Sequence, residues 1–274
     1  SEEQLHFALS RLKHRGPDAD GIFINSLKTA ALVHTRLSIQ DLSSSANQPM
    51  ISESKQFAIT YNGEIYNSSE LKNKYLPNFK FKTSGDTELL LELFAKYKES
   101  ILQEINGIFS FGILDLSTNE ILIARDRFGV KPLYYRVDSL SFVFASEIKA
   151  LLTPENNLSL DKGSIARSLS LLWTPHPNTC FKEIKKLHPG TFMKIRDSKV
   201  ISSESFYNLD HYQKNDFSFE ENKYILRNLL RQSIERQLIS DVPLGTFLSG
   251  GLDSTSIVNQ ISNIAEQINS FSMI

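Results

Sequence analysis

The stretch LSGGLDS combines two adjacent glycines with hydroxyl and carboxylate side chains, a pattern suited to binding an anion. An apolar run, VPLGTFL, precedes it, and a helix-forming run, DSTSIVNQISNIAEQI, follows it. We therefore expect a strand, a tight loop and the N-terminus of a helix. Glycines let a backbone approach a bulky anion, and the N–H groups of a first helical turn favour negative charge. The candidate phosphate-binding loop comprises Leu248, Ser249, Gly250, Gly251, Leu252, Asp253 and Ser254.

Two details of this loop narrow the kind of phosphate that it would hold. It lacks the Lys of the GxxxxGK[ST] phosphate loop, so other groups must neutralise the charge. Asp253 would repel a phosphate unless a divalent cation lay between them, and we therefore assign Asp253 to Mg²⁺, directly or through water. This arrangement suits a leaving pyrophosphate better than a γ-phosphoryl group. Taken alone, the stretch also fits a glycine turn capped by Asp253 that binds nothing.

The elements upstream of this loop are mostly short strands. Runs such as FAITYNG and GIFSFGILDL are rich in β-branched and aromatic residues and are closely spaced, which favours antiparallel pairing. TAALVHTRLSI is expected to be one strand, and Asn62-Gly63 to be a turn. QLHFALSRL and GDTELLLELFAKY have helical periodicity. The second helix is expected to place five apolar residues on one face: Leu89, Leu90, Leu93, Phe94 and Tyr97.

The composition changes near Phe206, where FYNLDHYQKNDFSFEE is polar and aromatic without a clean period. A long amphipathic helix, NKYILRNLLRQSIERQLI, is expected after it. VPLGTFL is apolar on both sides, as a buried parallel strand would be, and NSFSMI is expected to be its neighbour. We predict a β-rich domain over residues 1–206, a linker over 207–218 and the beginning of an α/β domain over 219–274.

Bulk composition limits the function classes. The chain has 274 residues, of which 41% are hydrophobic and 22% charged, as in an ordinary soluble globular protein. Its net charge of -1 argues against a nucleic-acid surface. No apolar run approaches the ~20 residues of a membrane helix. The single cysteine, Cys180, excludes an internal disulfide and a multi-Cys metal site and suits a reducing cytosol, so we expect a cytoplasmic protein.

A series of motifs then occurs in an order that resembles glutamine-dependent asparagine synthetase of the B type. The motifs are HRGPD, HTRLSIQDL, NQPM, YNGEIYN, SGDTELLL, ARDRFGVKPLYY, FASEIKALL and SGGLDS, and they cover essentially the whole chain. The resemblance implies a class II glutaminase domain of the N-terminal-nucleophile fold, an αββα sandwich. It further implies that the second domain begins an α/β adenine-nucleotide α-hydrolase-like parallel sheet that acts as an ATP pyrophosphatase.

The resemblance also implies the ligands and the reaction. Aspartate would be activated as β-aspartyl-AMP with release of pyrophosphate, and ammonia from glutamine would convert it to asparagine. Glutamine, ATP and aspartate are thus the expected small-molecule substrates, Mg²⁺ is the expected metal, and a homodimer is compatible with the resemblance. Arg125-Asp126-Arg127 is expected to form a structural or interdomain ion-pair network and to take no part in catalysis.

The glutamine site is assigned by the same resemblance, and the residue types fit it. Arg36 can clamp a carboxylate with a bidentate pair of hydrogen bonds, and two carboxylates can hold the ammonium. The Asn62 side chain and the Gly63 N–H, in a tight turn, can form an oxyanion hole. Taken singly, these residues are more often a surface ion-pair partner, a hairpin turn and a helix cap. The implied site comprises Arg36, Asn62, Gly63, Glu64 and Asp86.

The catalytic nucleophile departs from the family pattern. Class II glutaminases use the cysteine at their own N-terminus, whose α-amino group is the general base. Ser1 begins this chain and directly precedes a helix-like run, so we do not expect it to replace that cysteine. Cys180 is expected to be a structural thiol. We therefore expect a fragment truncated at both ends that does not hydrolyse glutamine by itself.

Two alternative functions stay open at this point. A related amidotransferase that amidates another carboxylate, such as a sugar acid, would carry the same motifs, because only the acceptor pocket would differ. A non-catalytic module that binds glutamine or a nucleotide would explain the absent nucleophile.

Overall fold

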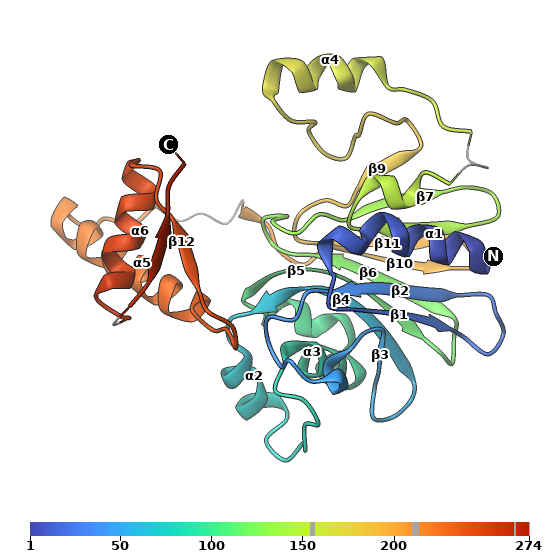
Figure 1. Ribbon diagram of the computed structural model, residues 1–274, viewed down its shortest axis with the longest axis horizontal. Helices are drawn as coiled ribbons and strands as arrows, with labels where there is room; N and C mark the ends of the chain where they lie inside the picture. The colour runs from blue at the N-terminus through green and yellow to red at the C-terminus, as the bar shows by residue number, and fades with distance from the viewer. Residues whose placement is uncertain (154–156, 210–213, 266, 274) are drawn as a thin grey trace. The chain divides into compact units, whose positions relative to one another are not determined.

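The computed structural model describes residues 1–153, 157–209, 214–265 and 267–273. The chain divides into two compact units, Ser1–Asn208 and Leu209–Ile274, whose elements are shown in Figure 1. Within the described residues, no helix is both long enough and apolar enough to cross a membrane.

A six-stranded antiparallel sheet forms the centre of the first unit, with the strand order β11-β10-β6-β5-β4-β3. The hairpin between β5 and β6 is closed by Asp115, whose carboxylate accepts the N–H groups of Ser117 and Thr118. The strands are β3 (Met50–Ile51), β4 (Phe57–Ile65), β5 (Gly107–Asp115), β6 (Glu120–Arg125), β10 (Thr191–Arg196) and β11 (Lys199–Ser205).

Helices α2 (Ser68–Tyr75) and α3 (Asp86–Tyr97), with the 3₁₀ segment η3 (Lys98–Gln103), pack on one face of this sheet. The apolar residues predicted to line one face of α3 belong to the core or, for Tyr97, pack against it, but burial extends around the helix, because every residue from Asp86 to Phe94 is buried. Two glutamates inside α3 have hydrogen-bond partners. Glu88 accepts the N–H groups of Lys82 and Thr83, and Glu92 accepts the N–H of Glu53. Buried carboxylates are stable when hydrogen-bonded in this way.

A second β layer covers the other face. It consists of the ribbon β1 (Ala19–Ile24) and β2 (Ala31–Arg36) and of a three-stranded sheet with the order β8-β7-β9. Leu32 of β2 packs with Ala58 of β4, and Phe144 of β8 packs against the same cluster. The three-stranded sheet comprises β7 (Tyr134–Val137), β8 (Phe142–Ala145) and β9 (Ile184–Lys186).

Helix α1 (Glu2–Leu12) forms the outermost layer and contacts both β2 and the 3₁₀ segment η4 (Ile148–Leu151). The sequence QLHFALSRL is helical as predicted, and Ser1 caps the helix in a capping box with Gln4. The layers of the first unit are therefore α, β, β and α, which confirms the predicted αββα sandwich. The remaining elements of this unit are η1 (Lys13–Arg15), η2 (Ser44–Ala46) and α4 (Lys162–Leu171).

Two predictions of strand and turn positions in this unit are wrong. Asn62-Gly63 is not a turn, because both residues lie inside β4 opposite Ser110 and Phe109. The run TAALVHTRLSI is a strand only over Ala31–Arg36, because the chain then enters a loop. The alternating apolar residues of this run gave no sign of that loop.

The expected ion-pair network of Arg125-Asp126-Arg127 is also absent from the described residues of this unit. Arg125 donates to the carbonyls of Gly129, Lys131 and Leu187. Asp126 is 1% exposed and accepts backbone N–H groups. These residues therefore hold main chain through hydrogen bonds instead of pairing charges. The donors to Asp126 are the N–H groups of Phe109, Phe128, Val130 and Lys131.

The second unit contains α5 (Phe219–Gln237), β12 (Gly245–Phe247), α6 (Leu252–Ser262) and β13 (Asn269–Phe271). β12 and β13 are parallel, and α6 connects them in a βαβ arrangement. Ser218 caps α5 in a capping box, so the helix begins before NKYILRNLLRQSIERQLI. Residues 210–213 of the predicted linker lie outside the described residues.

Two predictions for the second unit need correction. VPLGTFL is not a buried strand, because only residues 245–247 are extended and Phe247 is 83% exposed. The described part of the chain gives β12 one neighbouring strand, which leaves its side chains uncovered. Helix α6 ends at Ser262, earlier than DSTSIVNQISNIAEQI suggests, and Glu266 of that run lies outside the described residues.

Candidate functional site

A cavity of about 790 Å³ in the first unit is lined by all five residues of the implied glutamine site: Arg36, Asn62, Gly63, Glu64 and Asp86. Residues of α1, β2, β4, β5, β8 and η4 also line it. The volume falls within the ~300–1,000 Å³ of typical small-molecule sites.

The position of Gly63 in β4 directs its N–H into this cavity. Leu116 N donates to Gln56 O, and Tyr66 N donates to Asn106 O, so the even-numbered residues of β4 hydrogen-bond with β5. In an antiparallel pair, alternate residues direct their N–H and C=O groups away from the partner strand. Gly63 is one of these residues, and β3 pairs only with residues 58 and 59 further back along β4.

Tyr61 and Ile65 lie on either side of Gly63 along this edge and also direct main-chain groups away from β5. Side chains form hydrogen bonds with these groups. Gln48 bonds both main-chain groups of Tyr61, accepting from its N–H at 2.6 Å and donating to its carbonyl at 3.1 Å. The N–H of Ile65 donates to Asp86 Oδ2 at 2.8 Å. The Gly63 N–H lies between these two hydrogen-bonded neighbours and faces the cavity.

Only glycine fits at position 63. A Cβ there would lie 2.4 Å from the carbonyl oxygen of Ile108 and 2.7 Å from Phe109 Cα, both of which are backbone atoms of β5. The neighbouring Asn62 side chain also lines the cavity, and within the described residues it makes no hydrogen bond to another group. Its amide is therefore free to donate to a ligand.

The cavity wall carries both signs of charge. Asp86 is 7% exposed, and burial raises its pKa, although hydrogen bonds from the Tyr61 hydroxyl at 2.7 Å and from Ile65 oppose this. Burial and the charge of Asp86 also raise the pKa of Glu64, while Lys131 lowers it. Two carboxylates that repel each other bind a shared cation favourably. Such a wall complements a zwitterion with a carboxylate and an ammonium.

Arg36 is buried, and its guanidinium is occupied by protein acceptors. Nη1 donates to Ser43 O at 2.9 Å and to Asn47 Oδ1 at 2.8 Å, while Nη2 donates to the carbonyls of Gln40 and Asp41. Both terminal nitrogens thus hold the loop after β2. In this structure Arg36 shapes the cavity wall and contributes positive charge, and the expected bidentate clamp is not preformed.

Sequence reasoning missed Gln48, Tyr61 and Lys131 as members of the site. All three line the cavity. Gln48 lies within the NQPM motif and Lys131 within ARDRFGVKPLYY. Motif membership was therefore the only available signal, because nothing in the spacing of these residues shows that Gln48 reaches the edge of β4.

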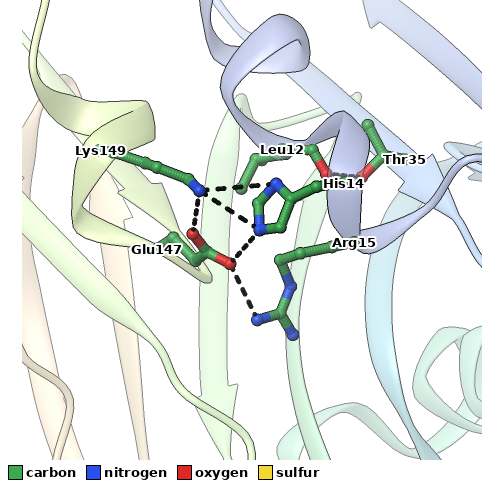
Figure 2. A network of polar contacts seen from close by, with 6 residues as sticks. All are labelled: Leu12, His14, Arg15, Thr35, Glu147 and Lys149. Atoms are coloured by element: carbon green, nitrogen blue, oxygen red, sulfur yellow. Dashed lines mark hydrogen bonds and ion pairs between the residues drawn. The ribbon is translucent and has the colours of Figure 1, made fainter.

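A network of polar contacts ties the outer helix to the second β layer (Figure 2). Glu147 accepts from His14 Nε2 at 3.0 Å, Arg15 Nη1 at 3.2 Å and Lys149 Nζ at 3.0 Å. Partial burial opposes ionisation of Glu147, but these donors hold its pKa below the usual value. The Thr35 hydroxyl donates to Leu12 O at 3.2 Å. The network joins two motifs far apart in sequence, HRGPD and FASEIKALL.

Within the described residues, no cysteine lies beside Asn62 and Gly63 in the cavity. Cys180, the single cysteine of the chain, is partly buried and does not line the cavity. Ser1 does line it, and its hydroxyl accepts the N–H of Gln4 at 3.4 Å as the cap of α1.

The SGGLDS stretch of the second unit forms a loop that ends at α6. Gly250 has φ +77°, and no atom lies within 4 Å of a Cβ placed on it. The Ser249 and Ser254 hydroxyls lie 3.0 Å apart, and Gly251 is the N-cap residue of α6. Asp253 is exposed in the first turn, so it does not cap the helix. The described residues contain no group of three or more His, Cys, Asp or Glu side chains placed to hold a metal ion.

The protein families that the chain matches agree with this fold and this cavity. Residues 1–207 match the family model described as "Glutamine amidotransferase domain". The chain belongs to this glutamine amidotransferase family. Residues 225–273 of the chain match a second family model, "Asparagine synthase".

Curated relatives of the chain include asparagine synthetase [glutamine-hydrolyzing] 1 of Bacillus subtilis (strain 168), which is 34% identical over 275 residues. Asparagine synthetase B of Escherichia coli (strain K12) is 34% identical over 259 residues, and amidase chry2 of Gibberella zeae is 32% identical over 269 residues. The alignments cover 99%, 93% and 97% of this chain but only 43%, 40% and 40% of the relatives. The chain thus spans about two-fifths of the length of these relatives.

A solved glutamine phosphoribosylpyrophosphate amidotransferase from B. subtilis has a similar fold. It aligns with a TM-score of 0.55 at 19% identity, over 98% of this chain and 62% of that one. At this identity the likeness shows the fold alone, and it supports the predicted N-terminal-nucleophile architecture.

Proposed function

We propose that the cavity of the first unit binds the glutamine of an ATP-dependent asparagine synthetase, of which this chain carries the glutaminase domain and the beginning of the synthetase domain. The observation that carries the proposal is the Gly63 N–H, held between two fixed neighbours and facing the cavity beside the free amide of Asn62. Two donors in this position suit the oxyanion that forms when an amide is hydrolysed.

The rest of the wall supports glutamine as the ligand. Its ammonium would face Glu64 and Asp86, and its carboxylate would lie on the side of Arg36 and Lys131, with the side-chain amide at Asn62 and Gly63. Hydrolysis would release glutamate and ammonia. This step requires a nucleophile, and Cys180 is not placed to supply one.

The second unit would hold the pyrophosphate of ATP. The loop from Leu248 to Ser254 fits this group, because the space around Gly250 is open and the first turn of α6 offers N–H donors. Asp253 is a single carboxylate, so phosphate oxygens would have to supply further ligands for Mg²⁺. Mg²⁺ bound there would neutralise the charge of the leaving pyrophosphate. In the complete reaction, the β-carboxylate of aspartate would form β-aspartyl-AMP, and ammonia would displace AMP to give asparagine.

The names of two relatives favour an acceptor other than aspartate as a second candidate. Relatives at 32% and 30% identity are named amidases and not asparagine synthetases. The glutamine site would be shared by both kinds of enzyme, so the proposal for the first unit holds for either acceptor.

Isothermal titration calorimetry with L-glutamine tests the proposal for the first unit. The wild-type chain should bind glutamine, and Asn62→Ala should weaken binding roughly tenfold through loss of one hydrogen bond. Asn73→Ala, on the exposed face of α2, is the matched control and should leave binding unchanged. Equal affinities for the wild type and Asn62→Ala would contradict the proposal.

A glutaminase assay tests the role of the thiol. The chain should show no cysteine-dependent turnover, and Cys180→Ala should change nothing. Turnover that disappears in Cys180→Ala would show that the nucleophile had been wrongly excluded.

A further inference from the structure

The loop after β2, residues 37–46, and the start of α3 both contribute to the cavity wall, although they are far apart in sequence. Asp86, which the proposed function assigns to the ammonium of glutamine, is the first residue of α3. The position of the loop relative to this helix therefore affects the shape of the glutamine site. The lining residues of the two segments include Leu37, Ile39 and Gln40 in the loop and Gly85, Asp86 and Thr87 at the helix.

Asp41 connects these two segments but does not itself line the cavity. Its Oδ2 accepts the N–H of Ser84 at 2.7 Å, and Ser84 directly precedes Gly85, the N-cap residue of α3. Its Oδ1 accepts the N–H and the hydroxyl of Ser43 at 3.0 and 2.6 Å. One carboxylate is thus hydrogen-bonded both to its own loop and to the beginning of the helix.

The beginning of α3 needs such an acceptor, because its own cap residue cannot provide one. Gly85 has no side chain, and a Cβ placed on it would lie 3.7 Å from Asp41 Cβ, so the loop approaches closely. N–H groups at the start of a helix lack partners within the helix, and the helix dipole favours a negative charge beside them. The Ser43 hydroxyl and, after it, the Ser84 N–H lower the pKa of Asp41, although partial burial opposes this. Asp41 therefore supplies a charged acceptor from 43 residues away.

Arg36 holds the same loop at other points. Its Nη2 donates to the carbonyls of Gln40 and Asp41, and its Nη1 donates to the carbonyl of Ser43. Asp41 has φ +52°, a left-handed conformation that Asp, Asn and Gly adopt more readily than other residues. Arg36 thus fastens the main chain of the loop to the end of β2, whereas the Asp41 carboxylate fastens the loop to the start of α3. Removing the carboxylate would loosen the second attachment and leave the first in place.

We propose that Asp41 is a positioning residue of the glutamine site, because its carboxylate holds the loop after β2 against the start of α3. Asp41 does not touch the ligand and acts through the wall residues on both sides, above all Asp86. A carboxylate that binds an ammonium must be held in place, since hydrogen bonds and ion pairs weaken as their atoms move apart. The inference rests on the proposed function, because it concerns the same cavity and the same ligand.

Calorimetric titration of the full chain with L-glutamine tests the role of Asp41. Asp41→Gly removes the carboxylate without straining the main chain at φ +52°, and it should weaken glutamine binding roughly tenfold or more. Asp41→Asn also suits this conformation, but its one oxygen can replace only one of the two carboxylate oxygens, so its affinity should be intermediate. The matched control Ser45→Gly adds a glycine at an exposed position of the same loop and should change the affinity by less than about twofold.

Amide hydrogen exchange followed by NMR tests the same connection without a ligand. The Ser84 N–H should exchange faster in Asp41→Gly than in the wild type or in Ser45→Gly, because only Asp41→Gly lacks its acceptor. The N–H groups of Ile113 and Ile123, which are buried in the central sheet, should exchange slowly in all of these chains. Slow exchange there shows that the fold is intact and that the effect of Asp41→Gly is local.

Three results would overturn the inference. The first is equal glutamine affinity of Asp41→Gly and the wild type, and the second is a loss in Ser45→Gly as large as that in Asp41→Gly. The third is exchange of the Ser84 N–H that is equally fast in the wild type and in Asp41→Gly. If the wild type binds no glutamine, the proposed function is refuted, and the exchange of Ser84 still decides whether Asp41 holds the loop against the helix.

Discussion

A partly buried histidine of the cavity wall gives a stability prediction that depends on no ligand. His34 lies on β2, and its Nδ1 is 3.0 Å from the Thr60 hydroxyl. Burial, and then the nearby charge of Arg36, lower its pKa from 6.5 to about 4. The folded chain therefore keeps His34 neutral over a range in which the unfolded chain protonates it.

The sign and size of the effect follow from this difference. Between about pH 6.5 and about pH 4 the unfolded state binds more protons, so stability falls as the pH falls. From about pH 7.5 to about pH 5 the loss from His34 alone is about 2 kcal/mol.

Urea unfolding at these two pH values measures the effect. His34→Gln removes the titrating ring and should lose about 2 kcal/mol less than wild type over the same interval. His6→Gln, on the exposed surface of α1, controls for removing an imidazole as such. Equal pH dependence in wild type and His34→Gln, or an NMR titration of His34 near pH 6.5, would refute the reasoning.

Three further predictions concern the site and its support. Asp86→Asn should weaken glutamine binding at least tenfold in calorimetry. The binding of glutaramate, which lacks the ammonium, should not change. Equal losses of affinity for the two ligands would show that Asp86 does not contact the ammonium. Gly63→Ala should lower the free energy of unfolding by roughly 1–3 kcal/mol in urea melts. The control Gly85→Ala, whose Cβ meets nothing closer than 3.7 Å, should stay within about 0.5 kcal/mol of wild type. Equal stabilities of the two variants would contradict the close approach of position 63 to Ile108. Asp126→Ala should destabilise by about 3 kcal/mol or more, because four backbone N–H groups lose their acceptor, and an unchanged urea midpoint would refute this.

The sequence was sufficient for the fold class because its signals are local. Strand alternation, the helix QLHFALSRL and the ordered motifs each depend on short stretches, and the αββα layers follow from them together with the family resemblance. Individual strand ends were less predictable. Asn62-Gly63 has turn chemistry, yet β4 continues through it because Gly63 is required for contact with β5, a constraint that only tertiary structure reveals.

The sequence could suggest which residues share a cavity, but not the hydrogen bonds that they make. All five implied residues line one cavity, which motif order alone could suggest. The role of Arg36 in holding the following loop depends on carbonyls brought together by folding, and so does the bond of Gln48 to the edge of β4.

A crystal structure of the chain with L-glutamine tests the central claim most directly. The account predicts that the side-chain amide oxygen lies within about 3.2 Å of both Gly63 N and Asn62 Nδ2, with the ammonium facing Asp86. Glutamine bound elsewhere on the chain, or bound in this cavity with its amide turned away from Gly63, would contradict it.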